Sequence, residues 1–398
     1  MIYFSLAFLL FALSVYYDIN GKTANKDFWY YCILVIFITI AGMRYRIGID
    51  TLSTCYVFYH ETPSIDKFFT EFSILQYPLW NFLKSLVYTL GGRFYMLQFV
   101  QSAIVNILIF KYIKKHSSYL FTCVFLYFLW KYPTYNFEEM KQSCAVVVSL
   151  FANDYILEKK YLKGALLYII ACMFHFGAVP IFLVSFLVFL RFNYKGLLFV
   201  FFGLIIGIIM QTQFENYLML FGFDDFIQEK MEGYASSDRF FAIIGKNIKF
   251  YIVNFLILIF YVFFSFKFVK RNKSDIDLLK FEPYLVLGLF FIVLNSVIAI
   301  FYRFANYYSI YFVLFIAQAF VDISKRERCR FTYLKSVLLF FPFFFYVIFT
   351  YVGLGDSDRY HKFYPYSSII EMRIDKDREK TYSNHMYDEI FPPHPSEY

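Results

Sequence analysis

The chain has 398 residues, of which 60% are hydrophobic and only 17% are charged, whereas soluble globular proteins average about 25% charged residues. This composition excludes a soluble enzyme and indicates a polytopic membrane protein. The formal net charge of +8 comes from Lys and Arg in short segments between apolar runs, so it indicates cytoplasmic loops and not a nucleic-acid partner.

The apolar runs define the expected helices in chain order. A membrane-spanning helix needs about 20 mostly apolar residues, because unpaired backbone groups are not tolerated in hydrocarbon. Twelve segments meet this requirement loosely, near residues 3–17, 28–43, 95–112, 118–132, 142–157, 162–174, 176–190, 196–211, 248–268, 284–301, 304–321 and 333–353. Residues 79–91 are too short and too polar to span, and we expect an interfacial or re-entrant helix there. The sequence therefore predicts an all-α fold with one transmembrane domain over 1–353 and a polar tail over 354–398.

Basic residues predict the orientation of these spans, because short loops rich in Lys and Arg stay in the cytoplasm. Five basic connections fall on one side, at residues 111–116, 158–163, 191–195, 267–280 and 322–335. The opposite, outer face then holds the segment 44–94, the loop 131–142, the turn at His175, the long loop 212–247, the turn at Arg303 and the tail. The loop 212–247 mixes acids, Tyr and Arg, as either a sugar-binding loop or a solvated linker would.

The first charged motif on the outer face is "GMRYRIGID", where the second apolar segment ends. Arg44 and Arg46 are compatible with ordinary interfacial anchors. However, arginine on the outer side runs against the usual charge bias, and Gly48 followed by Asp50 indicates a bend that holds a carboxylate beside the two guanidinium groups.

Two further motifs carry acids, a lysine and a histidine. In "NFEEMKQ", Glu138, Lys141 and Gln142 have the spacing that shares one helical face. Glu139 beside them is equally typical of an acid at a helix N-terminus. His175 lies between apolar flanks in "CMFHFGAVP", where a histidine is either a packed structural residue or a functional one.

The last motif, "FYRFANYY", places Arg303 with Tyr307 between two apolar segments. A guanidinium there suits an anion that it can bind bidentately, such as phosphate. Together the motifs predict recognition of a lipid pyrophosphate, with Asp50, Glu139 or His175 as the base. We favour His175, because apolar flanks favour its neutral form. No P-loop, Rossmann fingerprint or HExxH motif occurs, and we expect no cofactor and no metal.

Taken in order over roughly residues 1–350, these motifs resemble the successive blocks of the EpsG-type branch of the Wzy polymerases, the bacterial O-antigen and exopolysaccharide polymerases. On this resemblance the diphosphate-binding positions are Arg44 or Arg46, Lys141 with Gln142, and Arg303 with Tyr307. Arg46 is one residue out of the family spacing, and Lys141 stands where the family usually has Arg. Phe174 and His175 match the remaining block, and the tail has no counterpart.

The resemblance implies a GT-C-like, metal-independent glycosyltransferase of the bacterial inner membrane. It would transfer a growing glycan from undecaprenyl diphosphate to a new lipid-linked repeat unit on the periplasmic face. A chain-length regulator protein is a further partner that the resemblance suggests. Two other classes stay open. A flippase or other transporter also has about twelve helices, and a membrane O-acyltransferase also uses His and Arg.

Overall fold

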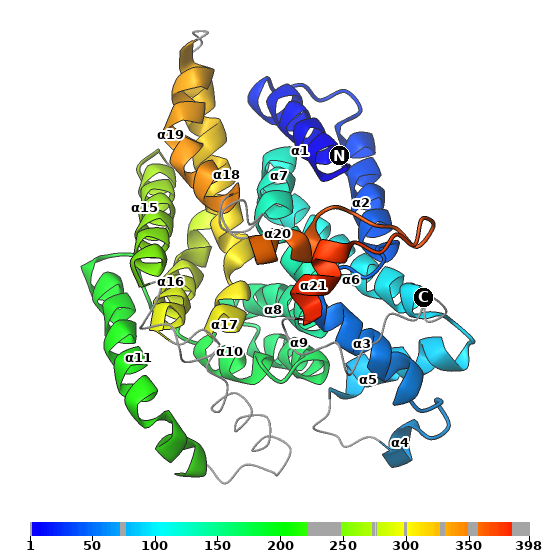
Figure 1. Ribbon diagram of the computed structural model, residues 1–398. Helices are drawn as coiled ribbons and strands as arrows, with labels where there is room; N and C mark the ends of the chain where they lie inside the picture. Colours follow the sequence, from blue (N-terminus) through cyan, green and yellow to red (C-terminus); the bar gives the residue numbers. More distant parts are fainter. Residues whose placement is uncertain are drawn as a thin grey trace. The chain divides into compact units, whose positions relative to one another are not determined.

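The structure is a computed structural model, in which residues 2–71, 77–220, 248–272, 275, 277–297, 301–326, 331–348 and 357–383 are described (Figure 1). All regular elements of these residues are helices, as expected, and the one β-type pairing among them is an isolated antiparallel bridge between Arg44 and Ser368. The chain divides into two compact units, one of residues 1–182 with 320–398 and one of residues 183–319.

The first unit contains most of the helices. They are α1 (Ile2–Leu13), a π-helix (Ser14–Ile19), α2 (Lys26–Gly42), α3 (Ile49–His60), α4 (Phe68–Glu71), α5 (Pro78–Thr89), α6 (Phe94–His116), α7 (Leu120–Trp130), a second π-helix (Thr134–Glu138), α8 (Met140–Leu157), α9 (Tyr161–Phe174), α19 (Phe331–Val347), α20 (Ser357–Phe363) and α21 (Lys376–Ser383). α10 (Ala178–Val184) leads into the second unit, and α18 (Ser309–Arg326) leads back.

The pair α8 and α9 forms the most extensive helix contact of the first unit. A short turn joins the two helices, and Gly164 on α9 allows them to approach closely, because a Cβ atom there would lie 2.8 Å from Cγ1 of Ile156. α6 packs against both α2 and α8. On this frame, α8 begins with Met140, and α9 ends directly before His175.

The second unit consists of α11 (Tyr194–Leu220), α15 (Ile248–Asn272), a 3-10 helix (Leu278–Phe281), α16 (Glu282–Val297) and α17 (Tyr302–Asn306). α16 packs against α11, where Phe199 and Phe290 stack with ring centroids 4.7 Å apart. α11 continues to Leu220, so the start of the expected loop 212–247 is helical. The rest of that loop lies outside the described residues.

Three stretches of the described residues are long and apolar enough to cross a membrane, namely Ile2–Ile19, Phe94–His116 and Leu278–Asn295. Four apolar helical stretches are shorter: Leu120–Trp130, Tyr161–Phe174, Tyr194–Gly207 and Val337–Val347. α5 confirms a helix at the expected interfacial segment, and its 12 residues are too few to span. The expected span 176–190 is wrong as one helix, because α10 ends at Val184 and residues 185–190 are not helical. The total of twelve spans, the GT-C-like architecture and the orientation stay predictions.

The C-terminal segment is folded onto the first unit. Its backbone pairs with the residues after α2, since Tyr45 N–H donates to the Ser367 carbonyl at 2.8 Å and Ile369 N–H donates to the Met43 carbonyl at 2.8 Å. The Tyr366 hydroxyl donates to the Ile40 carbonyl at 2.9 Å. The part of the polar tail that the structure describes is therefore an integral layer over the first charged motif.

Candidate functional site

Arg44 is completely buried inside the first unit, so its interpretation as an interfacial anchor is wrong. One terminal nitrogen donates to the carbonyl of Ala41, at the end of α2, and the other donates to the Thr51 hydroxyl at 3.1 Å. Its guanidinium carbon also lies 5.5 Å from the centroid of the Phe137 ring. Arg44 thus joins the end of α2, the first turn of α3 and the second π-helix.

Arg46 is held by the C-terminal segment. Its Nε and one terminal nitrogen donate to the two carboxylate oxygens of Glu379 on α21, each at 2.8 Å. This is the planar, bidentate arrangement that arginine makes with an anion. The two side chains are 6% and 25% exposed, so the pair is shielded from water.

The expected ion pair of Asp50 with Arg44 or Arg46 is not found among the described residues. Asp50 is instead half-buried in the first turn of α3, where its charge complements the helix dipole. The carboxylate beside Arg46 is that of Glu379. The prediction of an acid beside the guanidinium was therefore correct in type and wrong in residue.

Gly48 occupies a conformation that requires glycine. Its φ of +97° lies outside the range that side-chain-bearing residues adopt readily, and a Cβ atom there would lie 1.9 Å from the Phe137 carbonyl oxygen. The bend predicted at Gly48 is confirmed, and the close approach brings the start of α3 against the second π-helix.

The segment from Phe137 to Met140 connects the first charged motif to α8. The Thr51 hydroxyl donates to the Phe137 carbonyl at 2.5 Å and lies 3.6 Å from the Met140 sulfur. Because the π-helix ends at Glu138 and α8 begins at Met140, Glu138 does not belong to the same helix as Lys141, and the predicted shared face is wrong.

Two other side chains of this turn are nearly excluded from solvent. Glu139 precedes α8 and is 4% exposed, and Gln142, in the first turn of α8, is 2% exposed. Burial of both polar side chains at one helix start is unusual for a solvated loop. The expected outer loop is therefore packed structure at this point.

Lys141 and His175 meet on one aromatic ring. The Tyr77 ring lies parallel to the His175 imidazole, with centroids 5.5 Å apart and an interplanar angle of 4°. The Lys141 ammonium nitrogen is 4.5 Å from the centroid of the same ring, a cation–π contact. The structure thus brings together two sequence-predicted site residues that are 34 positions apart.

His175 follows the last residue of α9 and is 8% exposed. Its Nδ1 accepts a hydrogen bond from the Gly177 backbone N–H at 3.1 Å. When the ring is neutral, the other nitrogen, Nε2, therefore carries the proton. In this conformation the ring is a hydrogen-bond donor at Nε2.

Arg303 and Tyr307 lie in the second unit. Arg303 is in the short helix α17, where its Nε donates to the Tyr302 hydroxyl at 3.2 Å, and Tyr307 directly after α17 is completely buried. The expected convergence of Arg303 with Arg44, Lys141 and His175 stays a prediction.

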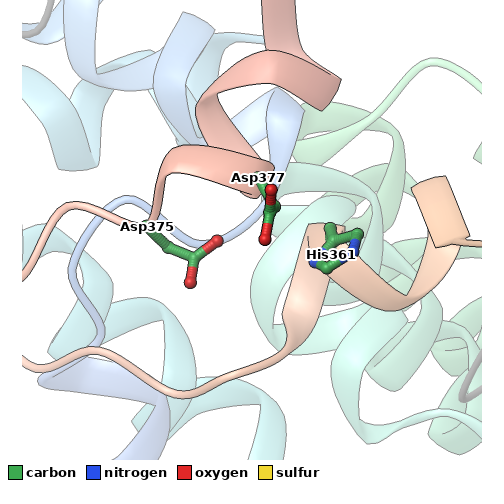
Figure 2. Close-up of side chains that lie close together, drawn as sticks. All are labelled: His361, Asp375 and Asp377. Carbon is green, nitrogen blue, oxygen red and sulfur yellow. The ribbon is translucent and has the colours of Figure 1, made fainter.

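One group of described residues could hold a metal ion. His361 from α20, Asp375 directly before α21 and Asp377 in its first turn offer ligand atoms within 4.8 Å of one another (Figure 2). The buried Arg378 guanidinium ties the two helices together by donating to the His361 and Pro365 carbonyls. One imidazole and two carboxylates suit a divalent cation. All three ligands are partly or fully exposed, however, and such groups are common without an ion, so we assign no metal function to them.

Four residues of this region were not singled out from the sequence: Thr51, Tyr77, Phe137 and Glu379. Thr51 directly follows the first charged motif and Phe137 lies within the second, but a hydroxyl or an aromatic ring at these positions does not by itself indicate a site. Tyr77 and Glu379 have no local signal, because their partners lie 64 or more positions away in the chain.

One comparison with known proteins identifies a family for this chain. A model of the EpsG family matches residues 27–368, which is most of the chain and includes all four charged motifs. No curated protein and no solved structure matches the chain. α21 with Glu379 lies beyond the matched region. The chain belongs to the EpsG family.

Proposed function

We propose that the chain is a Wzy-type polymerase that transfers a growing glycan from undecaprenyl diphosphate to a new lipid-linked repeat unit on the periplasmic face of the inner membrane. Family membership points to a polymerase of surface polysaccharide synthesis and to a membrane protein. The lipid-diphosphate donor, the absence of a metal requirement and the periplasmic orientation are the parts that we add.

The observation that carries the proposal is the meeting of three motifs around the start of α8. Arg44 from the first motif bonds to Thr51, which in turn contacts Met140 at the first position of α8. Lys141 follows, and it shares the Tyr77 ring with His175 from the third motif. Cations and an imidazole from distant segments therefore lie in one region.

This arrangement suits the departure of a lipid diphosphate. In the proposed transfer, the bond between the donor's anomeric carbon and a diphosphate oxygen breaks, and a bond from that carbon to an acceptor hydroxyl forms. The negative charge that grows on the diphosphate needs fixed positive partners, and stabilisation of such charge is a large part of catalysis in comparable reactions. Lys141 is the cation that we place on the diphosphate in this unit, and Arg303 of the second unit stays a predicted diphosphate-binding residue.

The acceptor hydroxyl must also lose a proton. His175 stays our predicted base, and its hydrogen bond with the Gly177 N–H determines which ring nitrogen is available for that role. Nδ1 must release the Gly177 N–H before it can accept a proton, whereas Nε2–H is ready to donate to a diphosphate oxygen as it stands. Asp50 and Glu139 are the alternative bases, and the diphosphate itself is a further acceptor.

The test is turnover by the purified, full-length protein in liposomes that contain lipid-linked repeat units. We expect the wild type to convert single units into a ladder of longer glycans. His175→Ala should lose at least tenfold in turnover and alter its pH dependence, whereas Asp50→Asn should leave the pH dependence in place if His175 is the base. Arg303→Lys should lose more than tenfold, because lysine keeps the charge without the bidentate fork.

Lipid-linked products in cells separate this function from the two alternatives. Loss of a polymerase leaves single repeat units on lipid, loss of a flippase leaves none displayed outside, and loss of an acyltransferase leaves full-length chains without an acyl group. A wild-type protein that makes no ladder from lipid-linked units, or deletion cells that keep full-length chains, would refute the proposal.

A further inference from the structure

Tyr77 stands out because it links two motif residues and belongs to neither motif. It directly precedes α5, which begins with Pro78, and its backbone has φ of 56° and ψ of 62°. A bulky residue in the left-handed region is uncommon, since its Cβ atom crowds the backbone there. An observed outlier of this kind justifies a search for a function at that position.

The contacts of Tyr77 indicate such a function. Its ring is parallel to His175 and lies under the ammonium group of Lys141. α5 also packs against α9, the helix that ends at His175, and against α3, which carries Thr51. The ring is therefore attached, through the helix that follows it, to the elements that carry the other site residues.

We propose that Tyr77 is a positioning residue that holds the Lys141 ammonium and the His175 imidazole in one fixed arrangement toward the departing diphosphate. This inference rests on the proposed polymerase function. Tyr77 itself touches no reacting atom in the mechanism, and it acts through the two side chains on its ring.

The physical reason is the flexibility of lysine. Its ammonium group is a point charge on a four-carbon stem, so it has many rotamers and no preferred direction toward a phosphate oxygen. An aromatic face attracts the cation and limits those rotamers. The parallel ring beside it fixes the plane of the imidazole, and with it the direction of the Nε2–H bond. Transition-state charge is stabilised best by groups that need not reorganise during the reaction.

The experiment compares Tyr77→Leu, which removes the ring, with Tyr77→Phe, which keeps it. In the liposome assay we expect Tyr77→Leu to lower kcat about tenfold and to change KM by less than about twofold, because the lost positioning acts on the transition state. Tyr77→Phe should keep most of the wild-type kcat. Tyr31→Leu is the matched control, since Lys114 lies 4.9 Å over the Tyr31 ring in a similar contact away from the site. We expect it to keep wild-type turnover.

A double-mutant cycle tests whether Tyr77 acts through Lys141. If it does, Tyr77→Leu should cost clearly less in a Lys141→Met background than in the wild type, because the group that it positions is already gone. Equal costs in the two backgrounds, or wild-type kcat in Tyr77→Leu, would overturn the proposal. If Tyr77→Leu does not elute as folded protein, Tyr77→Met removes the ring with an unbranched apolar side chain and serves in its place.

A labelling experiment keeps this inference separate from the proposed function. Reductive methylation of Lys141 in the purified protein, followed by mass spectrometry, needs no substrate. We expect Tyr77→Leu to accelerate the labelling of Lys141 at least threefold and to leave Lys114 unchanged. If the wild type makes no polymer but Tyr77→Leu accelerates the labelling, the polymerase function is refuted and the contact is kept. If Tyr77→Leu leaves the labelling of Lys141 unchanged, the positioning role is refuted in either case.

Discussion

Replacement of Gly48 by alanine is the sharpest test of the site's construction, because two separate effects act at this residue. The backbone φ of +97° is one that L side chains rarely adopt, and holding alanine in such a region costs about 1–3 kcal/mol. The added Cβ atom would also lie 1.9 Å from the Phe137 carbonyl oxygen. Since that oxygen belongs to the backbone, the start of α3 and the second π-helix must move apart.

The separation has a specific cost. To reach an ordinary contact of about 3.4 Å, the two backbones must part by more than 1 Å, which breaks the hydrogen bond from Thr51 to the Phe137 carbonyl. A buried hydrogen bond of this kind contributes about 1 kcal/mol, and an acceptor left unpaired costs about 1–3 kcal/mol. With the backbone strain, Gly48→Ala should destabilise the protein by about 3 kcal/mol or more, and it should also displace Arg44, which Thr51 holds.

Gly91→Ala is the matched control, because Gly91 has a φ of +71° and no heavy atom within 4 Å of its would-be Cβ atom. It should therefore show the backbone strain alone, about 1–2 kcal/mol. Both variants are compared with the wild type by thermal unfolding in one detergent and by glycan ladder formation in the liposome assay. If Gly48→Ala unfolds at the same temperature as Gly91→Ala and forms normal ladders, the close packing of Gly48 on Phe137 has no role in the site.

Two predictions concern other buried charges of the first unit. Glu379→Gln should lower the free energy of unfolding by about 2 kcal/mol, because it leaves the shielded Arg46 without its bidentate carboxylate. As a control, Glu371→Gln on the exposed part of the same segment should change the free energy of unfolding by less than about 0.5 kcal/mol. Equal thermal midpoints for the two variants would show that the Arg46–Glu379 ion pair does not stabilise the protein. Burial lowers the pKa of Lys84 from its ordinary 10.5 to about 8, with Glu61 acting in the opposite direction. The unfolded chain therefore binds more protons between about pH 8 and 10.5, and wild-type stability should rise there relative to Lys84→Met, by about 3 kcal/mol at most. Thermal midpoints of the two proteins from pH 6 to 10 measure this, and a constant difference would show that Lys84 does not titrate in that range.

The sequence alone predicted the class of the protein and nominated the residues of the candidate site. Runs of apolar residues predict helices because each run can satisfy its backbone only within itself, and the described elements are helical along most of those runs. The exception is the run 176–190, where the helix ends at Val184. The charged motifs identified Arg44, Lys141, His175 and Arg303, because charge within or beside an apolar run is costly and therefore conspicuous. Their order was enough to predict the family that the comparison confirms.

Only the tertiary structure decided which side chains hold these residues. Local spacing placed Asp50 beside the arginines and Glu138 beside Lys141, and both predictions failed. The bend at Gly48 directs Asp50 into the first turn of α3, and the chain changes from a π-helix to α8 between Glu138 and Lys141.

The partners that replaced them come from distant parts of the chain. Glu379 reaches Arg46 across 333 positions, and Tyr77 contacts both Lys141 in α8 and His175 directly after α9. Helical periodicity relates residues three or four positions apart, whereas these contacts depend on how α5, α8, α9 and α21 pack, which no local pattern encodes.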